Sequence, residues 1–134
     1  VHPGGPFWKN KDEGAWSIPK GEFDEDENAL DAAKREFFEE TSVALSGEFI
    51  ELPSVKMKSG KNVFAWAIET DIDAESIVSN HFEIEWPPRS GLKQSFPEVD
   101  KGAWFTVEIA IQKLNVNQVS LIESLQQKLT GKLR

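Results

Sequence analysis

Apolar residues in this chain recur with two different periods, which predict strands and helices in separate stretches. Apolar or alternating runs predict strands at 48–55, 62–70 and 81–86, and shorter strands at 15–18 and 103–105. Helical spacing and capping residues predict helices over about 28–41, after Thr106, and from residue 115 or 117 to about 129. Because the two kinds of element are mixed rather than strictly alternating, periodicity predicts the α/β or α+β class.

The same pattern predicts which faces are buried. Each long helix carries one apolar stripe, formed by Leu30, Ala33 and Phe37 in the first and by Val119, Ile122, Leu125 and Leu129 in the last. Both faces of the 62–70 strand are apolar, so we expect this strand to be covered on both sides. Asp26 or Asn28 is suited to cap the first helix.

Length and composition narrow the class of protein. One domain fits 134 residues, of which 39% are hydrophobic and 28% charged. No run of 18 apolar residues is present, so no membrane span is expected. The absence of cysteine excludes disulfide and thiolate chemistry and favours a cytoplasmic location. A net charge of −8 argues against extended nucleic-acid binding, which relies on Lys and Arg.

The chain opens on Val1 rather than methionine, and residues 1–5 resemble the frayed end of a strand. We therefore expect a single domain over residues 1–134 that lacks an N-terminal strand. A naturally shortened domain is the alternative.

An unusual concentration of acid marks the first predicted helix. Glu36, Glu39 and Glu40 stand at i, i+3 and i+4, so their carboxylates share one face within one turn. Like charges at this spacing cost about 0.2–0.5 kcal/mol per pair, and anions near a helix C-terminus are disfavoured further. A bound divalent cation makes these unfavourable electrostatic energies favourable. Carboxylate oxygens are ligands that Mg²⁺ or Mn²⁺ takes.

The residues around this helix resemble the Nudix box, G-x5-E-x7-R-E-U-x-E-E-x-G-U, where U is apolar. The matching positions are Gly21, Glu27, Arg35, Glu36, Phe37, Glu39, Glu40 and Val43. Ser42 departs from the pattern, because the box has a glycine there. That glycine ends the helix in a left-handed conformation, so the departure concerns the cap and leaves the acidic positions intact.

This resemblance implies a Nudix fold, a mixed β-sheet sandwiched between α-helices, and a metal-dependent pyrophosphohydrolase activity. It implies that Glu36, Glu39, Glu40 and the Gly21 carbonyl hold Mg²⁺, or Mn²⁺ in its place. Arg35 is expected to pair with Glu27, and with Glu39 at i+4. A carboxylate, either Glu39 or one outside the box, is expected to act as general base.

Four residues outside the box are further candidates. Pro19-Lys20-Gly21 resembles the start of the box in the diadenosine polyphosphate hydrolase branch, where the lysine meets a phosphate; a solvated loop lysine is the alternative. Glu98 lies in a segment where many Nudix enzymes place another carboxylate, which binds metal or acts as the general base. The alternative is that Glu98 is a surface acid. Arg89 is a candidate phosphate clamp or a surface arginine. Trp86, or Phe82, is a candidate to stack on a base or a core residue.

The sequence therefore predicts an enzyme that cleaves a phosphoanhydride in a nucleoside diphosphate joined to another group, with a dinucleoside polyphosphate favoured as substrate. Nucleoside triphosphates and RNA 5′ ends are the alternatives within this class. A nucleotide-binding sensor without catalysis is the alternative from another class. The partner is a small nucleotide, and the pattern gives no oligomeric state.

Overall fold

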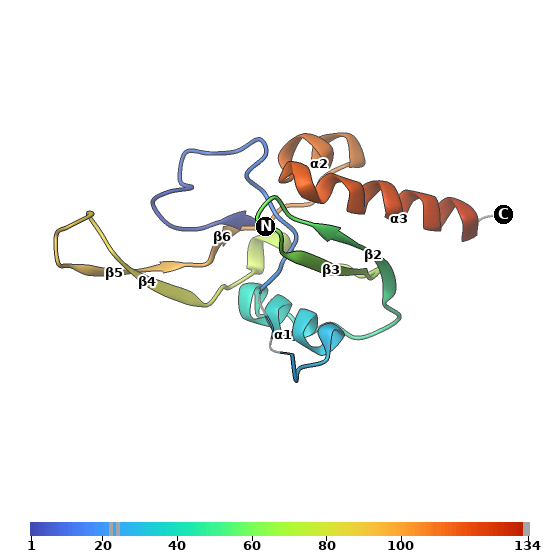
Figure 1. Ribbon diagram of the computed structural model, residues 1–134, viewed down its shortest axis with the longest axis horizontal. Helices are drawn as coiled ribbons and strands as arrows, with labels where there is room; N and C mark the ends of the chain where they lie inside the picture. Colours follow the sequence, from blue (N-terminus) through green and yellow to red (C-terminus); the bar gives the residue numbers. More distant parts are fainter. Residues whose placement is uncertain (22, 24, 133–134) are drawn as a thin grey trace.

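The computed structural model describes residues 1–21, 23 and 25–132, and these residues form an α+β arrangement (Figure 1). The strands are β1 (His2–Pro3), β2 (Ile50–Lys56), β3 (Asn62–Ala67), β4 (His81–Glu85), β5 (Lys93–Pro97) and β6 (Val99–Lys101). The helices are α1 (Ala29–Thr41), α2 (Val107–Lys113) and α3 (Val119–Lys132), with short 3₁₀ turns η1 (Ala74–Ser76) and η2 (Val116–Gln118). The α+β class expected from the sequence is confirmed.

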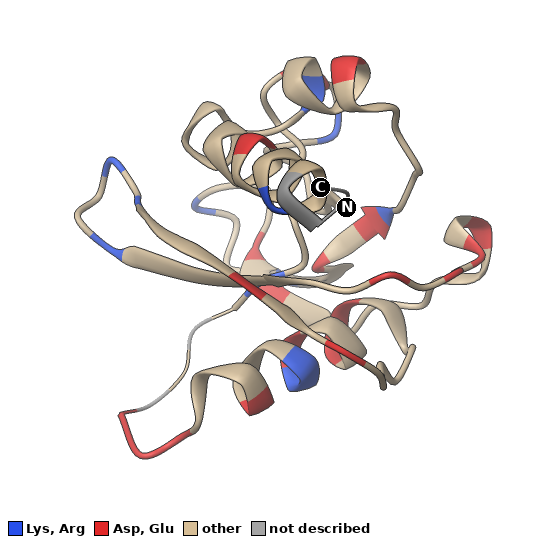
Figure 2. Ribbon diagram, turned by 90° about the vertical axis from the view of Figure 1, so that its right-hand side faces the viewer, with Lys and Arg blue, Asp and Glu red and all other residues tan. Residues whose placement is uncertain are grey.

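The strands pair two by two. Across the described part of the chain, β1 pairs with β6, β2 with β3 and β4 with β5, each antiparallel, and Trp16 makes a parallel bridge to Leu114. The strands of the expected mixed sheet are therefore present here as three separate pairs. The β2–β3 pair lies between α1 and α3 (Figures 1 and 2), so the layered order of helix, strands and helix is present at this pair.

Helix α1 begins and ends at residues whose side chains or backbone suit the cap. The Asn28 side chain accepts hydrogen bonds from the backbone N–H groups of Leu30 and Asp31, at 3.0 and 3.1 Å. Of the two candidates, Asn28 is thus the cap. Ser42 ends the helix in the left-handed region (φ 65°), and its N–H donates to the Phe38 carbonyl at 2.7 Å. The serine therefore adopts the conformation expected of the glycine it replaces.

The buried face of α1 differs from the apolar stripe. Ala32, Glu36 and Glu40 are buried, whereas Leu30 and Phe37 are half-buried and line an apolar cavity of about 380 Å³ between α1, β3 and α3. The prediction that the stripe of Leu30, Ala33 and Phe37 is the buried face was therefore wrong. Hydrophobic periodicity missed this face because two of its members are acids, which a pattern of apolar positions counts as exposed.

The core is built around the β2–β3 pair and α3. Leu52, Ala65 and Leu121 form the buried cluster, and partly buried residues pack against it: Ile18, Val55, Ala67 and Leu125. Phe64, on the other face of β3, is 49% exposed. Full cover on both sides of this strand was thus a wrong prediction, because the ring of Phe64 borders two open cavities instead of a packed layer.

The segment after β6 also differs from expectation. Residues 103–105 form no strand; Trp104 is 64% exposed and its indole N–H donates to the Ile72 carbonyl at 2.7 Å, while the Phe105 ring packs edge-on against Trp16. The contacts of these two aromatic residues hold the segment in place. Its backbone is irregular and is not paired as a strand. Thr106 caps α2 as expected, and Asn115 caps η2, which leads into α3. In α3, Leu121 is the buried residue and Leu129 is exposed.

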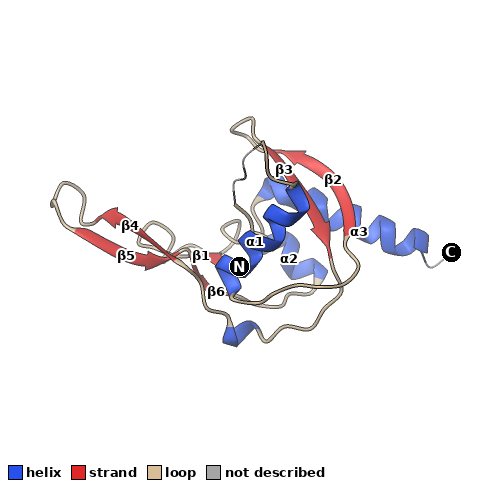
Figure 3. Cartoon of the chain, turned by 90° about the horizontal axis from the view of Figure 1, so that it is seen from below, coloured by secondary structure: helices blue, strands red, loops and turns tan. Residues whose placement is uncertain are grey.

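Strands β4 and β5 form an arm that extends away from the three helices (Figures 1 and 3). The described helices include none with the length and apolar character needed to cross a membrane.

Candidate functional site

Arg35 gathers the acids around α1. Its guanidinium makes a two-bond contact with Glu27, from Nε at 2.9 Å and from Nη2 at 3.0 Å. Its Nη1 reaches Glu36 at 2.9 Å and Glu39 at 3.2 Å. These carboxylates raise the pKa of Arg35, with Glu27 the largest cause. The pairing of Arg35 with Glu27 and Glu39 that was predicted is confirmed. It joins helix α1 to the loop that precedes it, where Figure 2 shows acidic residues in red.

Glu40 is the most deeply buried acid of this group. Its carboxylate accepts a hydrogen bond from the backbone N–H of Lys20 at 2.8 Å. The pKa of Glu40 is raised to about 7: burial is the largest cause, the backbone hydrogen bond from Lys20 opposes it, and the charges of Glu98 and Glu36 contribute to the rise. Glu40 therefore carries its proton more readily than an ordinary glutamate at neutral pH.

Glu36 stands one turn before Glu40 on α1 and is likewise buried against the loop that precedes the helix. Burial raises the pKa of Glu36, as do the neighbouring charges of Glu39 and Glu98, while Arg35 lowers it. Gly21 packs directly against this side chain, because a Cβ built on Gly21 would overlap the Glu36 carboxyl group. A side chain at position 21 would displace the Glu36 carboxyl group, so glycine at this position allows Glu36 to keep its place.

Glu98 lies where the chain passes from β5, which pairs with β4, to β6, which pairs with β1. Its charge raises the pKa of both Glu36 and Glu40, so its carboxylate stands near the box acids although it is distant in sequence. The structure thus places the charge of Glu98, at the β5–β6 junction, within electrostatic reach of the acids of α1, and its role in metal binding or as base stays a prediction.

The carboxylate oxygens of these acids are ligands that a hard divalent cation takes, but they are not arranged as a complete metal site. In the part of the chain that the structure describes, no three acidic or histidine side chains are arranged to hold a metal. Arg35 is hydrogen-bonded to one oxygen each of Glu36 and Glu39, and the Lys20 N–H to one oxygen of Glu40. The carboxylate oxygens and their mutual repulsion favour binding of a cation.

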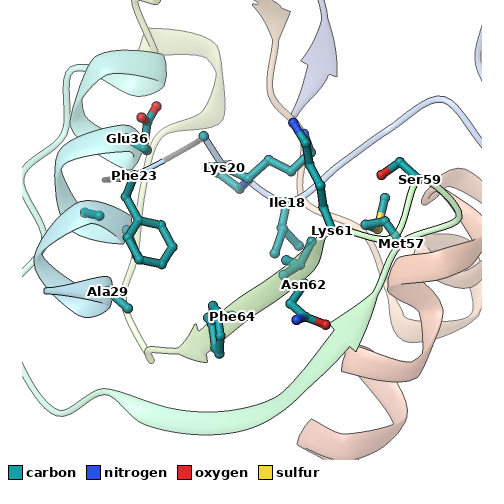
Figure 4. Close-up of a pocket in the computed structure, with 15 residues that line it drawn as sticks. Ile18, Lys20, Phe23, Ala29, Glu36, Met57, Ser59, Lys61, Asn62 and Phe64 are labelled. Carbon is teal, nitrogen blue, oxygen red and sulfur yellow. The ribbon is translucent and has the colours of Figure 1, made fainter. Parts of the chain in front are cut away.

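A cavity of about 630 Å³ opens beside Glu36. Figure 4 shows Glu36 and Phe23 on its α1 side and Met57, Ser59 and Lys61 toward the β2–β3 turn. Lys20 and Gly21 also line the cavity. Lys20 therefore lies next to both the acids and an open volume, the position that a phosphate-binding lysine requires.

The other two predicted substrate residues lie elsewhere. Trp86 follows β4 and packs edge-on against Phe7, and Arg89 lies in the turn between β4 and β5 with a positive φ of 63°. Phe82, the alternative to Trp86, packs between Gly5 and Phe96. Since these residues belong to the β4–β5 arm, they do not line the cavity beside Glu36.

Sequence reasoning missed several residues that shape the site. Phe23 and Phe64 form an edge-on pair at 6.1 Å at the cavity, and Lys61 lines it. Asn80 and Ser79 hold the backbone of Glu98 and Val99. The sequence marks Phe64 only as one apolar residue of a strand, and no local pattern marks Ser79, whose role depends on a contact distant in sequence.

The raised pKa of Glu40 predicts a pH-dependent stability. The unfolded chain ionises this group near its ordinary pKa of about 4.3, and the folded chain only near 7, so Glu40 lowers stability progressively as pH rises from about 4.5 through 7. We expect Glu40→Gln to be more stable than the unchanged protein at pH 8 without metal, and this gain to vanish near pH 4. Urea unfolding at several pH values measures it; a gain that does not depend on pH contradicts the assignment.

A model of the NUDIX domain family matches residues 5–125 of the chain. Searches of the curated proteins and of the solved structures returned no match. Members of the matched family generally use divalent metals such as Mg²⁺.

Proposed function

Because the chain belongs to the Nudix family and is thus a hydrolase of pyrophosphate bonds, we propose that its substrate is a dinucleoside polyphosphate, cleaved at a phosphoanhydride bond. The observation that carries the proposal is the meeting of acids from two elements, Glu36 and Glu40 from α1 and Glu98 from the β5–β6 junction, beside a cavity that Lys20 lines.

The acids of α1 and Glu98 have different roles in this proposal. Glu36, Glu39 and Glu40, with the Gly21 carbonyl, would hold Mg²⁺, or Mn²⁺ in its place. A cation held by these residues would supply positive charge to neutralise the phosphates and would make the attacking water more acidic. Glu98 accepts a proton from the attacking water, and Glu39 is the alternative base. Arg35 and Glu27 keep the acidic end of α1 in register through their two-bond contact.

Lys20 gives the substrate proposal its local support. The side chain of Lys20 lines the cavity beside Glu36, while its backbone N–H holds Glu40. A phosphate oxygen beside the acids would therefore meet the lysine charge directly. The Pro19-Lys20-Gly21 sequence favours dinucleoside polyphosphates within the family. The net charge of −8 disfavours long RNA, whose backbone needs many cations.

The experiment that tests the proposal is a substrate panel with Mg²⁺ and product analysis. The panel holds a dinucleoside tetraphosphate, nucleoside triphosphates and a triphosphorylated short RNA, with EDTA as control. We expect metal-dependent cleavage, and the largest kcat/KM for the dinucleoside tetraphosphate. Faster cleavage of another class replaces the substrate proposal, and nucleotide binding without cleavage of any member identifies a sensor instead.

A further inference from the structure

Three residues between η1 and β4, Val78–Asn80, connect the end of α1 to the Glu98 loop, and we name them the 78–80 strap. On the helix side, the Asn80 N–H donates to the Glu39 carbonyl at 2.8 Å and the Val78 N–H to the Thr41 carbonyl at 3.1 Å. The Ser42 hydroxyl donates to the Val78 carbonyl at 2.5 Å. The strap therefore satisfies carbonyl groups of the last turn of α1, which have no partner within the helix.

The other side of the strap holds the Glu98 backbone. The Glu98 N–H donates to the Asn80 carbonyl at 2.9 Å, and the Val99 N–H donates to the Ser79 hydroxyl oxygen at 3.0 Å. The Ser79 hydroxyl itself donates to the Asn80 carbonyl at 2.8 Å. The Glu98 carbonyl accepts from Gly4 N–H at 2.8 Å. Asn80 is thus bonded to Glu39 and to Glu98 at once.

This arrangement matters because Glu98 lies between two strand pairs. The register of β5 with β4 ends at Pro97, and that of β6 with β1 includes Val99. Neither register includes Glu98, whose backbone is held instead by Asn80 of the strap and by Gly4, and of these two the strap is also bonded to α1. Of the bonds from the strap to residues 98–99, the one to Val99 comes from a side chain, that of Ser79, which is half-buried. Substitution can remove this bond without changing any acid.

We propose that Ser79 is a positioning residue, which sets the Glu98 carboxylate against the acids of α1 by holding the Val99 N–H. The proposal rests on the function proposed above for Glu98. Without the hydroxyl, the Val99 N–H loses its acceptor and the Glu98 loop gains freedom. A catalytic group displaced by about 1 Å can cost up to about 10²-fold in rate, so we expect Ser79→Ala to lower kcat roughly 10-fold with little change in KM.

The test compares Ser79→Ala, Ser79→Thr and Ser76→Ala. Threonine keeps the hydroxyl and is expected to restore kcat. Ser76→Ala is the control, because it removes a serine hydroxyl whose hydrogen bond goes to Asp73, the cap of η1, and not to the strap or to residues 98–99. Amide hydrogen exchange of Glu98 and Val99, measured by NMR without metal or substrate, is expected to accelerate in Ser79→Ala alone. Ser42→Gly, which suits the positive φ at this position, removes the bond from Ser42 to the strap and serves if Ser79→Ala does not fold.

A double-mutant cycle with Glu98→Gln separates positioning of Glu98 from general weakening. We expect Ser79→Ala to lower kcat in the unchanged background and to have little effect when Glu98 is already Gln. An equal loss in both backgrounds, or unchanged kcat and exchange in Ser79→Ala, overturns the proposal. If the unchanged protein cleaves no nucleotide, the proposed function fails, and the exchange rates still report whether Ser79 holds the loop.

Discussion

Glu98→Gln is expected to lower kcat by roughly 10²-fold or more, with little loss of stability. Glutamine keeps the size of the side chain and removes its charge and its basicity. Glu98 is half-buried at the junction of β5 and β6, and its charge acts on Glu36 and Glu40. Loss of this carboxylate removes either the base or a metal ligand. Steady-state kinetics with Mg²⁺, together with thermal unfolding, measures both effects.

Glu83→Gln is the matched control, since it makes the same change at an exposed position of β4. Its kcat is expected to equal that of the unchanged protein. A normal kcat in Glu98→Gln as well would make Glu98 an ordinary loop acid and leave Glu39 as the base.

The second large effect is expected at the acids of α1. Glu39→Gln and Glu40→Gln should each lower turnover by roughly 10²-fold or more, because each removes a charge that holds the metal or accepts a proton. Both variants should remain folded, and without metal Glu40→Gln should gain stability at neutral pH, since a buried and repelled carboxylate is lost. Mn²⁺ titration by calorimetry is expected to show weaker binding in both. Near-normal turnover in both variants would refute the site.

Leu30→Ala is the contrasting variant. Leu30 lines the apolar cavity and is half-buried, so its loss should cost less than the about 2–5 kcal/mol typical of a fully buried leucine. Its turnover per folded molecule should stay near that of the unchanged protein. The comparison distinguishes loss of chemistry at α1 from loss of packing on the same helix.

Residues of the box alone determined one part of this site. The spacing of Arg35, Glu36, Glu39 and Glu40 places these side chains within one or two turns of a helix, whatever the rest of the chain does. The helix, its Asn28 cap, the left-handed Ser42 and the contact of Arg35 with Glu39 are therefore local consequences of sequence. The match of Glu27 to the box predicted its pairing with Arg35, although spacing along the loop does not require it.

The pattern of apolar positions did not predict which residues of α1 are buried. That pattern assigned the core face of α1 to Leu30 and Phe37, while the folded chain buries Glu36 and Glu40. The acids are buried because Gly21 and the Lys20 N–H approach them from the preceding loop. This approach depends on tertiary packing, which leaves no periodic pattern of residues in the sequence.

The tertiary structure also decided which distant residues join the box. Glu98 was predicted from a resemblance, and its place beside Glu36 and Glu40 follows from backbone bonds through Asn80 and Gly4. Arg89 and Trp86 were also candidates in the sequence, yet the β4–β5 pairing places them on an arm, and they do not line the cavity beside Glu36. Side-chain type shows what a residue can do chemically, whereas long-range hydrogen bonds and strand pairing determine whether it reaches the site.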